Sequence, residues 1–94
     1  MSTNVFSMKE FFLFTFVSTS QALKAERILK KYGTEFIMIP TLREISSSCG
    51  LSVKIAPDKM EEYQSVLQRN DVVAEGIYHV QKIEGKHVID KLEA

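Results

Sequence analysis

The sequence has little of what several protein classes require. It contains one cysteine among 94 residues, so no disulfide can form within the chain. Its 12 basic and 12 acidic residues give a net charge of zero, which argues against the clustered basic excess of a nucleic-acid-binding protein. It has no glycine-rich phosphate loop, and its two histidines have no further ligands at metal-binding spacing. We therefore expect neither a cofactor nor a metal.

Long apolar runs are also missing. The stretch Phe11–Val17 is too short to span a bilayer, and residues 1–10 lack the basic start and cleavage pattern of a signal peptide. A chain of this length is expected to form one domain, 1–94, with a loose lead-in at 1–9. These features predict a cytoplasmic protein with a reduced thiol and without membrane or nucleic-acid partners.

Hydrophobic periodicity predicts alternating strands and helices. Residues 11–17 are almost continuously apolar, which is typical of a central strand. Ser18 and Gln21 have the spacing of a capping box that opens a helix over 19–32. Pro57 and Asp58 open a second helix, with Glu61 at capping-box spacing from Asp58 and Asn70 near its end. The remaining alternating segments predict strands at 35–39, 51–56, 75–82 and 87–91, the last two joined by a turn at Glu84-Gly85.

This order is β-α-β-β-α-β plus a C-terminal hairpin strand, the ferredoxin-like split βαβ pattern. We expect an α+β sandwich in which two helices cover one face of an antiparallel sheet. Ser52 and Lys54 alternate with apolar neighbours, which predicts one wet face for the third strand. The first strand is apolar on both sides, so a second copy of the chain is expected to cover the open face in a homodimer.

The only cysteine, Cys49, lies in the polar connection between the second and third strands. The split βαβ topology brings this connection to the same end of the sheet as the start of the first helix, so Cys49 is expected near Val17 and Ser18, with Thr19 beside them. Free amides at a helix start favour anions, so they bias a nearby cysteine toward its nucleophilic thiolate. Arg43 adds a positive charge, and Gly50 leaves room for a partner backbone. Three hydroxyls can donate hydrogen bonds to a sulfur anion: Ser46, Ser47 and Ser48.

Residue chemistry alone leaves the role of this segment open. A lone cysteine at a strand start is commonly a small buried hydrophobe, and three serines are commonly a solvated turn. Arg43 and Glu44 are commonly surface charges. The loop could instead bind an anion, with the cysteine incidental. His87 and Cys49 could meet as base and nucleophile, although their positions in the sequence do not establish it.

The segment 40–50, Pro-Thr-Leu-Arg-Glu-Ile-Ser-Ser-Ser-Cys-Gly, resembles the signature of the selenium/sulfur carrier-like family. Residues 14–26 are similar to the family's first strand and the start of its first helix. Members often have a second proline where this chain has Leu42. The likeness favours a carrier-like core at 10–73, followed by a C-terminal hairpin extension at 74–94.

The resemblance implies a carrier and not an enzyme. Cys49 would hold a persulfide or selenopersulfide, with Arg43 and Ser46–Ser48 as its surroundings and Gly50 giving access. A cysteine desulfurase or a selenium-delivering protein would be the donor, and an acceptor enzyme or carrier thiol would take the atom. Two alternatives remain open: a thiol-redox or small-molecule-sensing module, and an interaction protein whose cysteine is inert.

Overall fold

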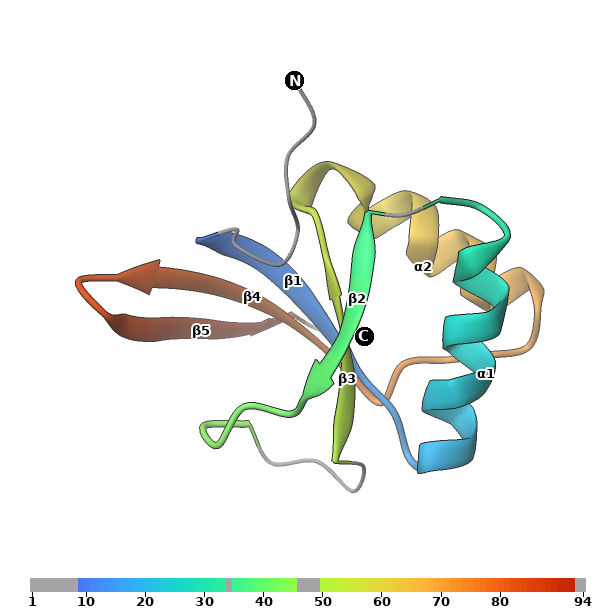
Figure 1. Cartoon of the computed structure of the whole chain (residues 1–94), viewed down its shortest axis with the longest axis horizontal. Helices are drawn as coiled ribbons and strands as arrows, with labels where there is room; N and C mark the ends of the chain where they lie inside the picture. Colours follow the sequence, from blue (N-terminus) through green and yellow to red (C-terminus); the bar gives the residue numbers. More distant parts are fainter. Residues whose placement is uncertain (1–8, 34, 46–49, 93–94) are drawn as a thin grey trace.

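The computed structural model describes residues 9–33, 35–45 and 50–92. This part of the chain forms one open antiparallel sheet of five strands with two α-helices (Figure 1), so the predicted α+β class is confirmed. The strand order is β2-β3-β1-β4-β5. The elements in chain order are β1 Glu10–Thr15, α1 Thr19–Lys30, β2 Phe36–Pro40, β3 Leu51–Ile55, the 3₁₀ turn η2 Pro57–Lys59, α2 Met60–Arg69, β4 Gly76–Ile83 and β5 Lys86–Leu92.

The central strand β1 pairs with β3 on one side and with β4 on the other. As expected, β3 lies between β1 and β2. However, β1 ends at Thr15, two residues before the predicted end, where its carbonyl accepts a hydrogen bond from the Glu75 amide at 2.7 Å. The chain then turns toward α1. Val17, which was expected to face an apolar side of the sheet, is consequently 59% exposed.

Helix α1 starts as its sequence predicts. The Ser18 hydroxyl caps it by accepting a hydrogen bond from the Gln21 amide at 3.3 Å. Its apolar stripe, Ala22, Ala25 and Leu29, is fully buried. The helix therefore turns one side to the sheet and leaves its basic side in solvent.

Helix α2 starts differently from the prediction. Pro57 begins the 3₁₀ turn η2, and Lys59 occupies the N-cap position of α2 without a side-chain capping bond. The capping box expected from Asp58 and Glu61 is therefore wrong, because the extra 3₁₀ turn moves the α-helix start past Asp58. The buried residues of α2 are Tyr63, Val66 and Leu67.

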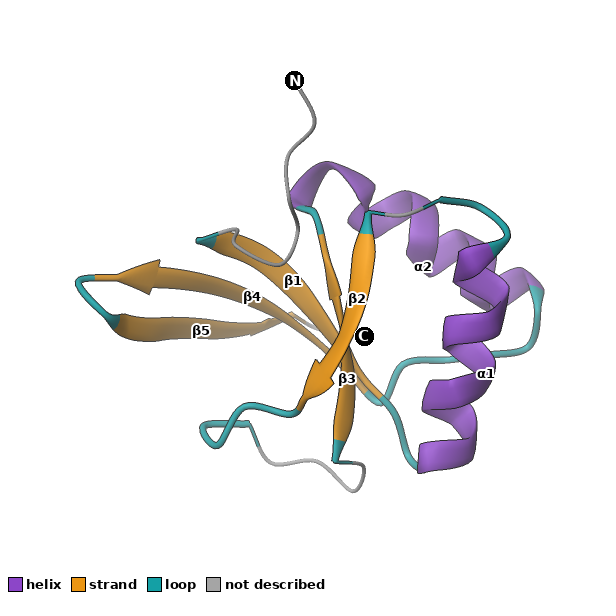
Figure 2. Ribbon diagram, in the orientation of Figure 1, coloured by secondary structure: helices purple, strands orange, loops and turns teal. Residues whose placement is uncertain are grey.

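Both helices lie on the same side of the sheet, which we call the helix-side face (Figures 1 and 2). Phe14, Val53 and Ile77 point from three adjacent strands into this layer, and all are buried. They form one cluster with the helices, whose further buried members are Phe16, Ala22, Ala25, Leu29, Phe36, Ile55, Tyr63, Val66, Leu67 and Val72. Tyr63 brings a polar hydroxyl to this main core, which donates a hydrogen bond to Glu35 Oε2 at 3.2 Å.

The opposite side of the sheet, the loop-side face, has a smaller apolar cluster. Phe11, Leu13 and Val80 are buried there with Tyr78 and with Ile45, which follows β2. Leu42, from the same connection, packs on this cluster as well. We expected this face to be left open by the chain itself. That expectation is wrong in part, because the β2–β3 connection covers part of the face. The homodimer across this face stays a prediction.

The predicted wet face of β3 is wrong. Ser52 is fully buried and Lys54 is only 7% exposed, although both were expected in solvent. The Ser52 hydroxyl is 2.7 Å from that of Thr41, and the Lys54 ammonium lies 4.3 Å from the centre of the Phe11 ring. Polar alternation in β3 thus marks the loop-side face, where these groups have partners within the protein.

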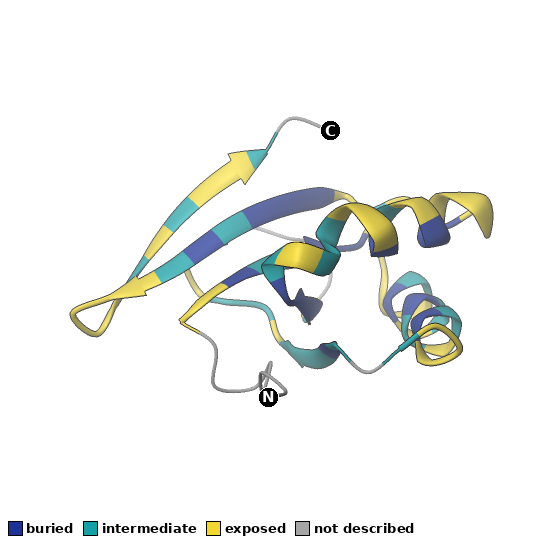
Figure 3. Ribbon diagram, turned by 90° about the horizontal axis from the view of Figure 1, so that it is seen from above, coloured by how far each residue is buried: buried dark blue, intermediate teal, exposed yellow. Residues whose placement is uncertain are grey.

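Strands β4 and β5 form the predicted hairpin. Glu84 and Gly85 at its turn both have positive φ, 50° and 78°, as a type I′ turn requires. β4 pairs with β1 over six residue pairs, so the sheet does not divide at residue 74. Figure 3 shows that the first part of β4 is buried and that the strand becomes exposed toward the turn of the hairpin. None of the helices in the described residues has the length and apolar character to cross a membrane.

Candidate functional site

The connection between β2 and β3 is fastened at both of its ends. The Thr41 amide donates a hydrogen bond to the Gly50 carbonyl at 2.9 Å, and the Thr41 hydroxyl lies 2.7 Å from the Ser52 hydroxyl. The backbone bond continues the β2–β3 ladder beyond its last register pair, Pro40 and Leu51, and the hydroxyl contact lies beside it. In the sequence, Cys49 is the residue immediately before Gly50.

The first half of this loop is also held against the sheet. The Ile45 amide donates a hydrogen bond to the Leu42 carbonyl at 3.0 Å, which closes a turn with Arg43 and Glu44 at its exposed corner. The Ile45 side chain is 6% exposed because it packs in the loop-side cluster. The loop thus has an apolar anchor four residues before the cysteine.

The last strand also reaches this turn. His87 Nδ1 of β5 lies 3.5 Å from Glu44 Oε2, with 28% of the His87 side chain exposed. The sequence allows His87 to meet Cys49 as its base, whereas the contact that the structure shows is between His87 and Glu44 of the same connection. The C-terminal hairpin is therefore in contact with the connection that bears the cysteine.

The predicted shared edge is present for the described residues. In the β1–β3 register Thr15 is opposite Ser52, so Gly50 and Val17 both leave the ladder at the same end of the sheet. Helix α1 begins two residues after Val17, and its first turn lies at this edge (Figure 2). Ser18 and Thr19 are exposed there, with the Ser18 hydroxyl used as the helix cap.

Gly50 is exposed, and a Cβ atom placed on it would have no neighbour within 4 Å. Its φ is not positive, so neither backbone conformation nor internal packing requires glycine here. The glycine leaves open space beside the base of the loop. This is the environment expected if a partner approaches the adjacent residue.

Four predicted site residues lie outside the described part of the chain: Ser46, Ser47, Ser48 and Cys49. Their predicted roles, as thiol and as hydrogen-bond donors to it, stay predictions. The structure joins Thr41, Gly50 and Ser52 at the base of the loop and places Arg43 and Glu44 in the turn that follows β2. Ser18 and Thr19 lie at the same end of the sheet but apart from that turn, at the start of α1 (Figure 1).

Comparison with known protein families decides the relationship. Residues 11–79 match the family described as "Putative Se/S carrier protein-like". The chain belongs to this family. The match covers more than half of the chain and confirms the resemblance that the segment 40–50 carries. Neither the curated proteins nor the solved structures gave a match.

The Se/S carrier-like segment includes the whole β2–β3 connection and ends at His79, within β4. β5 and His87 therefore lie beyond the matched residues. The contact between Glu44 and His87 joins the family segment to the part of the chain that follows it.

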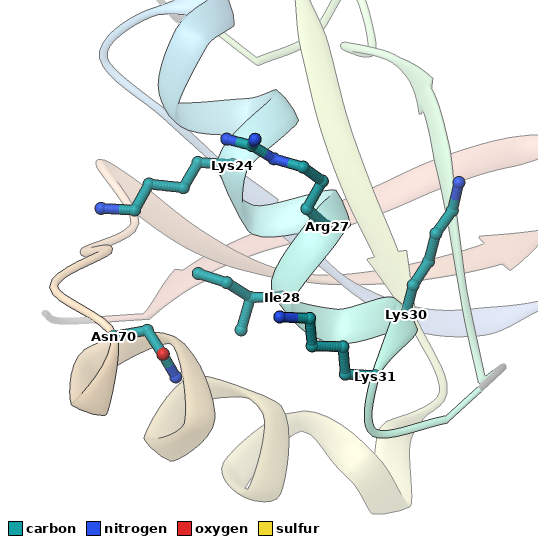
Figure 4. Close-up of a pocket in the computed structure, with 6 residues that line it drawn as sticks. All are labelled: Lys24, Arg27, Ile28, Lys30, Lys31 and Asn70. Carbon is teal, nitrogen blue, oxygen red and sulfur yellow. The ribbon is translucent and has the colours of Figure 1, made fainter.

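Two hollows of this carrier-family protein lie on its helix side. One, of about 350 Å³, is between α1 and the end of α2 (Figure 4), and the other, of about 410 Å³, is beside β2. Neither is lined by the described residues of the β2–β3 connection. Within the described ranges, no three His, Cys, Asp or Glu side chains are grouped so that they could hold a metal ion.

Sequence reasoning missed the residues that build the base of the loop. Thr41 and Ser52 are 11 residues apart, and only the β2–β3 register pairs their hydroxyls. A usable signal was present in Ile45, an isolated apolar residue in a polar segment, because such a residue is commonly an anchor that packs on the core. The Glu44–His87 contact had no signal, since it joins segments 43 positions apart.

Proposed function

We propose that this protein carries sulfur or selenium on Cys49, as a persulfide or selenopersulfide, and passes it from a donor protein to an acceptor. The donor is a cysteine desulfurase or a selenium-delivering protein, and the acceptor is an enzyme or a carrier thiol. In this role the protein has no turnover of its own. A reducing compartment such as the cytoplasm keeps its thiol free between transfers.

Loading and unloading are the same exchange run in two directions. The Cys49 thiolate attacks the terminal sulfur of the donor's persulfide; a new S–S bond forms, the donor's S–S bond breaks, and the donor leaves as a thiolate. An acceptor thiolate then attacks the terminal sulfur on Cys49 and releases Cys49 as a thiolate. Neither step needs an external oxidant or reductant, and selenium follows the same scheme as the terminal atom.

The family match over residues 11–79, which includes the cysteine-bearing connection, is the observation that carries this proposal. A second argument comes from composition. With one cysteine in the chain, no neighbouring thiolate can attack the inner sulfur of the loaded Cys49, form an internal disulfide and release the terminal atom as hydrosulfide or hydroselenide. The loaded state therefore persists until another molecule supplies a thiol, as a carrier requires.

The frame of the loop supports access to a partner. Gly50 stands in open space, Arg43 is at an exposed corner, and the first turn of α1 lies at the same sheet edge. A positive side chain and helix-start amides both stabilise a nearby thiolate. We expect Arg43→Gln to slow alkylation of Cys49 by iodoacetamide near neutral pH. Equal rates at every pH would remove Arg43 from the proposal and leave the carrier role intact.

The direct test is the mass of the intact native protein after incubation with a cysteine desulfurase and cysteine, or with a selenocysteine lyase and selenocysteine. We expect a gain of one sulfur or one selenium atom, which a thiol reductant removes. Cys49→Ser should show no gain. The chalcogen that is gained tells the two cargoes apart.

A relocated thiol provides the matched control. Ser65 is exposed on α2, away from the loop, so Ser65→Cys in the Cys49→Ser background presents an accessible thiol elsewhere. If that thiol is loaded as well as Cys49, loading reflects any exposed cysteine and the proposal fails. A gain of oxygen with peroxide but no sulfur transfer favours a redox sensor, and labelling of Cys49 only after denaturation favours an inert cysteine.

A further inference from the structure

The outer side of α1 concentrates positive charge on a protein whose net charge is zero. Three cations, Lys24, Arg27 and Lys31, recur at helical spacing opposite the buried stripe of this helix. Lys30 belongs to the same stretch, but its ammonium lies 3.7 Å from Glu26 Oε2. Positive charge is thus balanced by acid on the β2 side of α1 and left unbalanced on the side that faces the end of α2.

Figure 4 shows how the side chains lie on this unbalanced side. Lys24, Arg27 and Lys31 line a hollow between α1 and the end of α2. Lys30 also borders this hollow, and its ammonium points toward β2. Ile28 gives the hollow an apolar part, and Asn70 closes it from α2. The hollow measures about 350 Å³, and none of its lining residues is acidic.

Exposed apolar side chains lie next to these cations. Leu23, 48% exposed, is four residues before Arg27 and so sits one turn away on the same side of α1. Tyr32, 52% exposed, follows directly after Lys31. Arginine and aromatic residues beside apolar ones are typical of surfaces that bind proteins, where such residues supply most of the binding energy.

Most of these cations lie toward the C-terminal end of α1, which argues against a small anion as the natural ligand of this surface. Arg27 and Lys30 are in the last turn of α1, where the backbone presents carbonyl groups and the negative end of the helix dipole. A lone phosphate would find side-chain cations there but no backbone donors. An acidic protein segment meets several cations at once and covers the apolar residues between them.

We propose that the outer face of α1, formed by Leu23, Lys24, Arg27, Ile28 and Lys31 together with Asn70, is the docking surface for an acidic protein partner. The proposal rests on the proposed function in that this partner is the donor or the acceptor of the carried atom. It adds the location and the charge of the contact. Carboxylates of the partner pair with the three cations, and an apolar side chain packs on Leu23.

The surface is close enough to the loop for one partner to use both. At about 1.5 Å per residue, Leu23 lies only about 6 Å along α1 from Thr19, which is at the sheet edge shared with Gly50. A protein that covers the usual ~800 Å² of each partner spans far more than this distance. Docking on α1 therefore leaves the partner's thiol within reach of the same edge.

The test uses isotope-labelled Cys49→Ser protein, in which binding cannot be confused with sulfur transfer. Amide chemical shifts are followed by NMR as a short glutamate-rich peptide with one central leucine is added. We expect shifts in residues 23–31 and at Asn70, weakening with added salt because the contacts are exposed charges. The same peptide with glutamine in place of glutamate should shift no residue at equal concentration.

Charge reversal supplies matched variants. Lys24→Glu with Arg27→Glu should weaken peptide binding by ~tenfold or more, because two attractive contacts become repulsive. Lys82→Glu with Lys86→Glu changes the net charge equally, at exposed positions of the β4–β5 hairpin, and should leave binding within ~twofold. Leu23→Ala should weaken binding by about threefold through lost apolar contact, without changing charge.

Each other outcome overturns the docking surface. If both double variants lose peptide affinity equally, only the net charge of the protein attracts the peptide. Shifts centred elsewhere in the chain place the contact on another surface. Stronger binding of duplex DNA than of the peptide to residues 23–31 replaces the acidic protein with a nucleic acid. Loading of Cys49 by a desulfurase is measured separately, so the carrier function can hold while this surface fails, and the reverse.

Discussion

The two faces of the sheet are built in different ways. Among the described residues, 13 apolar ones are buried on the helix-side face, supplied by the strands, the two helices and the segments beside them. Five of the described apolar residues are buried on the loop-side face, Ile45 of the cysteine-bearing connection among them, next to the buried polar residues Thr15, Ser52 and Lys54. Stability therefore resides mainly on one face. The other face packs against the first residues of the cysteine-bearing connection, and each prediction below compares the two faces.

The largest effect is expected on the helix-side face. Leu29→Ala removes a fully buried side chain and should lower the free energy of unfolding by ~2–5 kcal/mol through lost transfer energy and a cavity. Leu23→Ala, on the same helix but 48% exposed, is the matched control and should change it by less than about 0.5 kcal/mol. Urea unfolding measures both. Similar losses in the two variants would contradict the assignment of the core to this face.

A smaller effect is expected where the loop packs. Ile45→Ala should lower the free energy of unfolding by about 1–2 kcal/mol. This is at or below the smallest loss usual for truncating a buried isoleucine, because a loop relaxes around a deleted side chain more readily than paired strands do. Amide exchange at Thr41 should also accelerate, since its bond to Gly50 closes the same loop. Unchanged exchange together with a loss as large as that of Leu29→Ala would show that the loop is part of the main core.

The buried Lys54 gives the loop-side face its own pH dependence. Burial, and then the positive charge of Lys82, lower the pKa of Lys54 below its ordinary value. Between the folded and the higher unfolded pKa, the folded protein binds fewer protons, so the free energy of unfolding rises with pH in that window. At alkaline pH, the free energy of unfolding of the wild-type protein should rise with pH relative to that of Lys54→Met. Parallel curves from urea unfolding across this window would refute the contribution of Lys54.

The fold class could be predicted because local signals agreed with the packing. Ser18 and the stripe Ala22, Ala25 and Leu29 define α1 in the sequence, and the positive φ values at Glu84 and Gly85 fit a turn that residue types already indicate. Periodicity fails where it assumes that polar means exposed. Ser52 and Lys54 alternate correctly, but only the path of the chain after Pro40 decides that their side is covered.

The sequence predicted at which end of the sheet the candidate site lies, but not which contacts hold the loop there. Topology alone brings Gly50 and the start of α1 to one end of the sheet, and the register agrees. The pairing of Thr41 with Ser52 depends on a register that sequence does not specify by itself. The spacing of Lys24, Arg27 and Lys31 in the sequence indicates a basic side of α1. The hollow beside it depends on the position of Asn70 at the end of α2, which the spacing does not predict.

The smallest expected effect concerns the contact between the loop and β5. The Glu44–His87 pair is partly exposed, so a double-mutant cycle of Glu44→Gln and His87→Gln should give a coupling of at most about 0.5 kcal/mol. That value is too small to hold the loop, which leaves Ile45 and the Thr41–Gly50 bond as its anchors. A coupling well above that of an exposed ion pair, measured by urea unfolding, would make β5 a structural support of the site. The loop-side face would then draw part of its stability from β5, which lies beyond the residues that match the family. The two faces would differ less in how much they contribute to stability.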